Sequence, residues 1–390
     1  MDEILICGGG FAGVWAAMSA AATRDWEQAG GLKITLLSDR PELCVRPRLY
    51  EGAAPDMLVP LSPLMAELGV DFVLGQATKV TERAVRASSG AVFPYDRLVL
   101  ATGSRAALPA IPRAAEFGFF VDTYESTARL DAHLAGLGTA SAAERRVVVI
   151  GAGLTGLEVA TNLRMRFGAA LEILLVDRAA NPGQGLGEAV EAEIATALVE
   201  ANVRFLGGDA PHSLTPEVLT LGSGRVLETH TVIFATGLRA SHLTAQVSAG
   251  TGANGRLVVQ PDLRVADRAE VFAAGDVALA QAERGRATLM SCQHAIPTGV
   301  IAGHNAVRDL LRQSTVVYGQ PDYATCIDLG PYGAVFTQGW DRALVKTRED
   351  GAEMKAEINR QWIYPPRPEL GRAAIHASVL ALLPQFERAA

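Results

Sequence analysis

The sequence has few cysteines, and none of them is spaced for a metal site or a disulfide framework. The four are widely scattered, at Cys7, Cys44, Cys292 and Cys326, and no C-x-x-C pair occurs. A zinc site or a small secreted scaffold would need a Cys/His cluster or closely spaced cysteines. We therefore predict no bound metal and a reducing compartment, for which the cytoplasm fits best.

Long apolar runs and basic blocks are also missing. No apolar stretch reaches the roughly 18 residues that span a bilayer, and the first apolar run begins almost at the initial Met, which leaves no room for a signal peptide. Lys and Arg number 35 against 42 Asp and Glu, a formal net charge of -7. This balance argues against a nucleic-acid partner. We expect a soluble protein, or at most one peripheral at the inner face of the membrane.

What the sequence does have is a repeated glycine-rich turn. Gly8-Gly9-Gly10-Phe11-Ala12-Gly13 and Gly151-Ala152-Gly153-Leu154-Thr155-Gly156 both fit G-x-G-x-x-G, and each follows a short apolar run. In such a turn the first glycine permits the tight bend, the second lets a pyrophosphate approach, and the third allows close helix–strand packing. The N-terminus of the following helix attracts the anion. Two matches predict two dinucleotide sites, between which an enzyme usually moves electrons.

The two copies share more than their glycines. In each, a second strand is followed by an acid that is placed to accept hydrogen bonds from a ribose, and a later apolar strand runs into A-T-G. An acid at the second site favours NADH, since the 2′-phosphate of NADPH would meet a carboxylate; Arg178 beside it keeps NADPH as the less favoured option. The acids are Asp39 and Asp177, and the strand ends are Ala101-Thr102-Gly103 and Ala235-Thr236-Gly237.

These motifs and Val271-Phe272-Ala273-Ala274-Gly275-Asp276, taken in order over residues 2 to about 310, resemble the two-dinucleotide-binding-domain flavoproteins. These form the pyridine nucleotide–disulfide oxidoreductase superfamily. The resemblance implies FAD at the first turn, NAD(P)H at the second, and Asp276 near the ribityl–pyrophosphate part of FAD.

The expected fold is α/β, with two Rossmann-like FAD/NAD(P)-binding domains, the second inserted in the first, plus a C-terminal α+β region. We place the FAD-binding domain at 1–108 and 239–312, the NAD(P)H-binding domain at 109–238, and an interface or dimerisation region at 313–390. The residues predicted to bind the cofactors are Gly8, Gly10, Phe11, Ala12, Gly13, Asp39, Arg40, Arg46, Ala101, Thr102, Gly103, Gly151, Gly153, Leu154, Thr155, Gly156, Glu158, Asp177, Ala235, Thr236, Gly237, Gly275, Asp276, Gln293, His294 and Ala295.

The absence of a cysteine pair limits which subfamily the sequence resembles. Disulfide reductases of this superfamily carry two cysteines beside the flavin, whereas Cys44 stands alone after the second strand and residues 107–240 contain no cysteine. Type II NADH:quinone dehydrogenases are more similar. Arg46-Pro47-Arg48-Leu49-Tyr50-Glu51 resembles their P-L-L-Y-E segment, and Glu158 matches the glutamate on their NAD helix. The stretch from Cys292 to Gly299 resembles their quinone motif A-Q-x-A-x-Q-x-G, from which Cys292 and Pro297 depart.

Three residues are candidates for catalysis. By the resemblance, Glu158 orients the nicotinamide, and the helix that begins near Cys292 directs its N-terminus at the flavin, where its dipole favours acceptance of hydride. Gln293 and His294 would then line the acceptor pocket, with His294 assisting proton transfer. A His294 that is only hydrogen-bonded to backbone is an equal alternative.

The acceptor stays open at this stage. A quinone is the first choice, a ferredoxin- or rubredoxin-like carrier protein the second, and a Cys44-dependent oxidase or disulfide reductase the third. A non-enzymatic alternative is an NADH-sensing flavoprotein that signals by dimerisation. Its one support is an apolar stripe on the last expected helix, which more often marks core or a dimer contact than a membrane face. The stripe comprises Ile375, Val379, Leu382, Leu383 and Phe386.

Overall fold

The computed structural model describes residues 2–139, 141 and 143–383. Its first unit is built on a six-stranded sheet in the order β21-β22-β9-β1-β2-β5. All neighbours in this sheet run parallel except β21 and β22. The strands are β1 (Glu3–Cys7), β2 (Lys33–Ser38), β5 (Asp71–Leu74), β9 (Arg97–Leu100), β21 (Arg264–Val265) and β22 (Arg268–Ala273).

Two helices of this unit, α1 (Phe11–Trp26) and α8 (Cys292–Leu310), pack unusually close together. A Cβ built on Gly299 or Gly303 would lie 2.3 or 2.1 Å from a carbonyl oxygen of α1, so the two glycines allow this approach. The contact fixes the N-terminus of α8 beside the first glycine turn.

The second unit has a five-stranded parallel sheet in the order β11-β18-β12-β13-β14. Its strands draw on residues 119–234, between the parts of the first sheet, so the α/β fold with an inserted second unit is confirmed. Its elements are β11 (Phe119–Phe120), β12 (Arg146–Ile150), β13 (Glu172–Asp177), β14 (Val203–Gly207), β18 (Thr231–Phe234), α4 (Tyr124–Ala135), α5 (Leu154–Phe167) and α6 (Glu188–Glu200).

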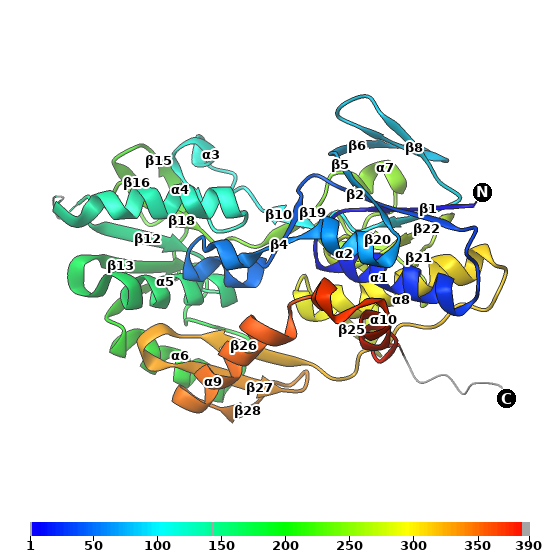
Figure 1. Cartoon of the computed structure of the whole chain (residues 1–390). Helices are drawn as coiled ribbons and strands as arrows, with labels where there is room; N and C mark the ends of the chain where they lie inside the picture. The colour runs from blue at the N-terminus through cyan, green and yellow to red at the C-terminus, as the bar shows by residue number, and fades with distance from the viewer. Residues whose placement is uncertain (1, 140, 142, 384–390) are drawn as a thin grey trace.

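The chain passes between the units through two short strands, β10 (Ser104–Ala106) and β19 (Leu238–Ala240), which pair antiparallel. Figure 1 shows the units on either side of this crossing. The limits predicted for the two domains, 1–108 with 239–312 and 109–238, stay predictions.

The smaller elements of the units are β3 (Glu42–Cys44), η1 (Arg46–Glu51), β4 (Leu58–Pro60), α2 (Leu61–Leu68), β6 (Ala77–Val80), β7 (Ala84–Ala87), β8 (Val92–Pro94), α3 (Ala114–Phe117), β15 (Pro211–Leu214), β16 (Val218–Leu221), β17 (Val226–Glu228), α7 (Thr244–Val247), β20 (Leu257–Val258), β23 (Ala278–Leu279), β24 (Gln281–Glu283) and β25 (Arg286–Ala287).

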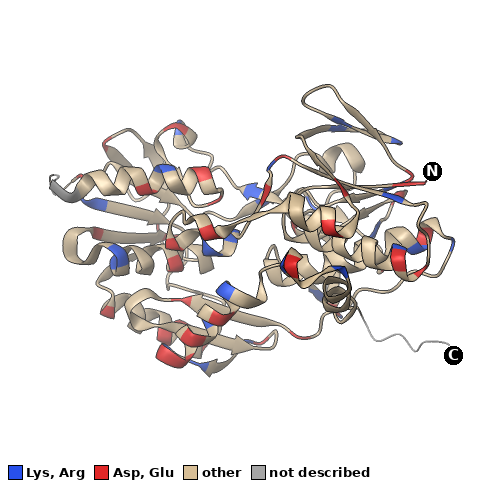
Figure 2. Ribbon diagram, viewed as in Figure 1, with Lys and Arg blue, Asp and Glu red and all other residues tan. Residues whose placement is uncertain are grey.

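The C-terminal part is divided between the two units. An antiparallel sheet of β26 (Ala324–Asp328), β27 (Ala334–Gln338) and β28 (Ala343–Lys346), with α9 (Arg348–Glu357), lies against α5 of the second unit (Figure 1). Figure 2 shows that acidic residues occur along both α6 and α9. The last described helix, α10 (Arg372–Leu380), returns to α1.

The apolar stripe predicted for the last helix is partly buried within the chain. Ile375 and Val379 join the core of the first unit, Leu383 is buried, and Leu382 is exposed. Phe386 lies outside the described residues, as does the end of the predicted region 313–390. A dimer through this region stays a prediction. No helix in the described part of the chain combines the length and the apolar character needed to cross a bilayer.

Candidate active site

The first glycine turn is shaped as the pattern predicts. Gly8 has φ +116°, and a Cβ on it would lie 2.2 Å from the carbonyl oxygen of Ala101, in the A-T-G segment. A Cβ on Gly13 would lie 1.7 Å from the carbonyl oxygen of Gly8. At Gly10 a Cβ would meet no described atom within 4 Å. The turn is therefore closed at its first and last glycines and open at the middle one, as a pyrophosphate requires.

The second turn repeats this arrangement. Gly151 has φ +107°, and a Cβ on it would lie 2.4 Å from the carbonyl oxygen of Ala235. A Cβ on Gly156 would lie 1.7 Å from the carbonyl oxygen of Gly151, while one on Gly153 would face open space. The two copies are thus alike in backbone and in steric detail.

The register of the two copies bears on the ribose-binding acid predicted for the first site, Asp39, which stays a prediction. The amide of Gly8 donates to the Leu37 carbonyl at 2.8 Å, and the amide of Gly151 donates to the Val176 carbonyl at 2.8 Å. The residues that follow these two carbonyls, Ser38 and Asp177, are therefore counterparts. Asp39 lies one residue further on, and a shift of one residue turns a side chain to the other face. It is exposed, with its Oδ2 3.4 Å from Arg105. The position expected to face the ribose therefore holds Ser38.

Asp177 itself is fixed by backbone amides. Its Oδ2 accepts from Ala152 N at 2.6 Å and its Oδ1 from Ala179 N at 2.7 Å. The carboxylate is therefore held against the second turn, where its charge would oppose a 2′-phosphate.

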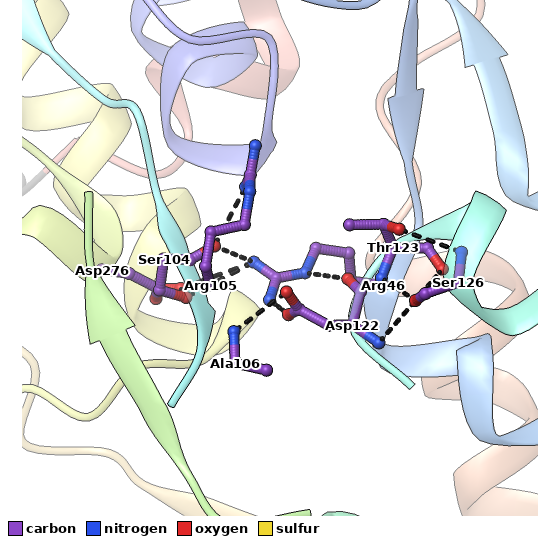
Figure 3. Close-up of polar contacts among 8 residues, drawn as sticks. All are labelled: Arg46, Ser104, Arg105, Ala106, Asp122, Thr123, Ser126 and Asp276. Atoms are coloured by element: carbon purple, nitrogen blue, oxygen red, sulfur yellow. Dashed lines mark hydrogen bonds and ion pairs between the residues drawn. The ribbon is translucent and has the colours of Figure 1, made fainter. Parts of the chain in front are cut away.

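Two residues predicted to hold FAD, Arg46 and Asp276, stand side by side at the crossing between the units (Figure 3). Arg46 is bonded to the Asp122 carboxylate, donates to the Ser104 carbonyl at 3.3 Å, and lies 3.9 Å from Asp276. Ser104 Oγ donates to Asp276 Oδ2 at 2.5 Å, and Asp122 Oδ2 accepts from Ala106 N at 2.9 Å. One polar cluster thus joins the first unit, strand β10 and the segment before α4.

Replacing Asp122 by Ala should loosen this crossing. The substitution leaves the half-buried Ala106 amide without its acceptor and Arg46 without its carboxylate partner, which costs about 1–3 kcal/mol of stability and should also weaken flavin retention. Urea unfolding followed by flavin fluorescence would measure both, with Asp341→Ala as a control because the Asp341 side chain is 96% exposed. An unfolding midpoint equal to that of the wild type would contradict the linking role.

Unpartnered polar atoms beside the first turn fit a bound cofactor. Thr102 Oγ1 and Arg40 Nε are buried, and neither has a hydrogen-bond partner in the part of the chain that the structure describes. The counterpart Thr236 differs, because its Oγ1 donates to the Ala107 carbonyl at 2.8 Å. The first turn, with its open middle glycine, therefore has both room and free polar groups for FAD.

Glu158, on α5, forms a buried ion pair that the sequence did not indicate. Its Oε1 lies 2.6 Å from Lys355 Nζ on α9 and accepts from Asp328 N at 3.3 Å. Lys355 also donates to the Cys326 carbonyl at 3.1 Å. Burial raises the pKa of Glu158, and Lys355 opposes this effect. Burial disfavours the charge of Lys355, but Glu158 outweighs it, so the pKa of Lys355 lies above its ordinary value.

At the N-terminus of α8, the structure places Gln293 and His294 in packed surroundings. The side-chain amide of Gln293 is oriented so that its NH2 group donates to the Ala324 carbonyl and its oxygen accepts from the Ala324 amide, both at 3.0 Å. His294 is 1% exposed, and its Nδ1 lies 3.0 Å from Gln320 Oε1. Its ring stacks on Tyr323 and Trp340. Burial lowers the pKa of His294, which favours the neutral ring. Proton transfer by His294 stays a prediction, and these contacts favour a positioning role.

The thiols are in surroundings that disfavour reactivity. Burial raises the pKa of Cys44, and it raises those of Cys7 to about 12 and of Cys292 and Cys326 to about 11. A thiolate is the reactive form of cysteine, and these groups hold their protons at neutral pH. The Cys44-dependent mechanism is correspondingly the weakest of the alternatives.

Comparison with known proteins shows the family to which the chain belongs. A family model described as pyridine nucleotide-disulphide oxidoreductase matches residues 2–299. An NADH dehydrogenase-like protein of Mycobacterium tuberculosis is 39% identical over 380 residues, which cover 94% of this chain and 95% of the relative. A type II NADH:quinone oxidoreductase of Staphylococcus haemolyticus is 24% identical over 372 residues, covering 85% and 89%.

A solved structure supports the fold. The sulfide:quinone oxidoreductase of Aquifex aeolicus matches with a TM-score of 0.78 and 19% identity, covering 99% of this chain and 94% of that one. The family match spans more than half of the chain, and the mycobacterial relative matches nearly all of it. The resemblance predicted from the motifs is confirmed: this chain belongs to the pyridine nucleotide-disulphide oxidoreductase family and is an oxidoreductase.

Proposed function

We propose that the protein oxidises NADH with FAD and passes the two electrons to a quinone. The observation that carries this proposal is the buried Glu158–Lys355 pair, which places a carboxylate on the helix of the second turn in contact with an ammonium group of the C-terminal part. The similarity to an enzyme named type II NADH:quinone oxidoreductase supports the same acceptor. NADH is preferred over NADPH because Asp177 stands beside the second turn.

The chain supplies binding and electrostatics. When bound, FAD accepts hydride and passes electrons on. The helix N-termini at Gly10 and Gly153 offer backbone N–H groups to the two pyrophosphates. In this proposal Thr102 and Asp276 help to hold FAD. The N-terminus of α8 presents partial positive charge, which favours negative charge that develops nearby.

Lys355 is the proposed proton donor to the acceptor. Two of its three N–H bonds are directed at Glu158 and at the Cys326 carbonyl. The third has no acceptor among the residues that the structure describes, and we assign it to an oxygen of the bound quinone. A carboxylate partner 2.6 Å away keeps the amine charged and therefore able to donate.

Stopped-flow reoxidation of the NADH-reduced holoenzyme tests the proposal. We expect rapid reoxidation by short-chain quinones that persists after thiol alkylation. Turnover only with a ferredoxin- or rubredoxin-like carrier would move the function to the second candidate. Loss of activity on alkylation of Cys44 would favour the third, and stable reduction without turnover would favour the sensor. A colourless protein that cannot be reconstituted with FAD would overturn the assignment.

Peripheral membrane contact and a homodimer are proposals that the same preparation can test by vesicle flotation and sedimentation.

A further inference from the structure

A second carboxylate, that of the half-buried Asp328, lies beside the Glu158–Lys355 pair. Asp328 ends strand β26, and its Oδ1 accepts from Gly330 N at 2.8 Å. Its Oδ2 accepts from the hydroxyl of Tyr50 at 3.0 Å. Tyr50 is buried, and the Lys355 ammonium lies 5.3 Å from the centre of its ring. These residues come from four separate elements, η1, α5, β26 and α9, which meet at this point.

The charges of this cluster do not balance. It holds the carboxyl groups of Glu158 and Asp328 but a single ammonium, that of Lys355, which is paired with Glu158. Within the described part of the chain, no Lys, Arg or His lies within ion-pair distance of Asp328. A carboxylate that is largely removed from water and has no paired cation is costly, and protonation is its ordinary relief. Burial raises the pKa of Asp328, against the opposing bonds from Gly330 and Tyr50.

The cluster has a polar connection to the surface. Asn359 Nδ2 donates to the Tyr50 hydroxyl at 3.1 Å and to Glu51 Oε1 at 3.2 Å. The Glu51 side chain is 22% exposed and is bonded to Arg48, which lines a surface groove of about 800 Å³. A line of hydrogen-bonded groups therefore runs from the groove to Asp328. Because Asn359 donates both of its bonds, it orients Tyr50 and does not relay a proton.

We propose that Asp328, which is partly exposed, is a proton-holding carboxyl for the acceptor half of the reaction and takes its proton from solvent. The inference rests on the proposed function. NADH gives up a hydride, which carries two electrons and one proton. A quinone that becomes a quinol takes two electrons and two protons, so the second proton comes from water. Asp328 would take up that proton from water and release it on the side of Lys355 and Glu158 as the quinone is reduced.

The kinetic test compares two acceptors in the holoenzyme. Ferricyanide takes electrons without protons, whereas a short-chain quinone needs both. We expect Asp328→Asn to slow reoxidation by quinone about 10²-fold or more, the usual contribution of a positioned acid, and to leave reoxidation by ferricyanide unchanged. Tyr50→Phe should slow the quinone step less and alter its solvent isotope effect. Asp322→Asn, at an exposed site, is the control. Equal slowing with both acceptors, or a wild-type rate with quinone, would overturn the inference.

A second measurement does not depend on the acceptor. A carboxyl whose pKa is raised by folding makes the folded state bind more protons than the unfolded one, so stability falls as pH rises through that range. Asp328→Asn removes this titration and keeps Glu51, Tyr50, Glu158, Cys326 and Lys355. We therefore expect the variant to gain stability relative to the wild type as pH rises above the ordinary pKa of aspartate. A difference independent of pH would refute proton holding by Asp328, whereas failure of quinones alone would count against the proposed function.

Discussion

Replacing Lys355 by Met is expected to lower the free energy of unfolding by about 3–5 kcal/mol. The substitution leaves the carboxylate of Glu158 buried without its partner, and removing one member of a buried pair is far costlier than removing both. Lys355 and Glu158 are each about a tenth exposed, so solvent does little to screen the loss. The same change removes the proposed proton donor, and quinone turnover should fall with it.

Chemical denaturation of the holoenzyme measures this effect. The double variant Glu158→Gln/Lys355→Met should recover most of the lost stability, since no unpaired charge remains. Lys346→Met, at a half-buried lysine for which the structure gives no ion pair, is the control and should change little. The pKa of Lys355 is raised in the folded state, so the pair stabilises fully below the ordinary pKa of lysine and loses this effect as pH rises above it. A loss below about 1 kcal/mol, the value of a surface pair, would show that the contact is not buried in solution.

The parts of the site that the sequence predicts are those set by local pattern. Each glycine turn lies between an apolar strand and a small-residue helix, and its steric demands involve residues only a few positions apart, such as Gly8 and Gly13. The repeat of the whole unit then predicts the two sheets and the insertion of the second. Gly275 and Asp276 follow because they close an apolar strand in the family's order.

The parts that the sequence does not predict depend on contacts between distant segments. Lys355 lies 197 residues from Glu158, in a helix whose sequence has no distinguishing motif, and its partner is set by the packing of the C-terminal sheet on α5. Asp328 belongs to a recognisable segment, yet its role depends on Tyr50, 278 residues away. The prediction at Asp39 depends on a different feature. The end of a strand is uncertain by a residue or more from sequence alone, and one residue decides which side chain faces the turn.

Replacing Gly10 by Val is expected to abolish FAD binding without unfolding the protein. Gly10 has φ -82°, which valine tolerates, and a Cβ at this position meets no described atom within 4 Å. The branched side chain would instead fill the space left for the pyrophosphate. The matched change Gly153→Val has the same geometry in the second turn, with φ -76°, and should spare the flavin while it prevents NADH from binding.

The two variants together test which nucleotide each copy holds. Purified Gly10→Val should be colourless, with FAD affinity lower by about 100-fold or more, equal to at least about 2.7 kcal/mol. Gly153→Val should be yellow, yet its flavin should not bleach on addition of NADH and should still be reduced by dithionite. Gly30→Val, at an exposed glycine with open space around its Cβ, should behave as the wild type. If Gly153→Val loses the flavin and Gly10→Val keeps it, the two sites are reversed. The two turns match in backbone and in steric detail. The assignment of FAD to the first turn and NADH to the second therefore rests on the residues around them, chiefly the unpartnered Thr102 hydroxyl and the nearby Asp276 at the first turn.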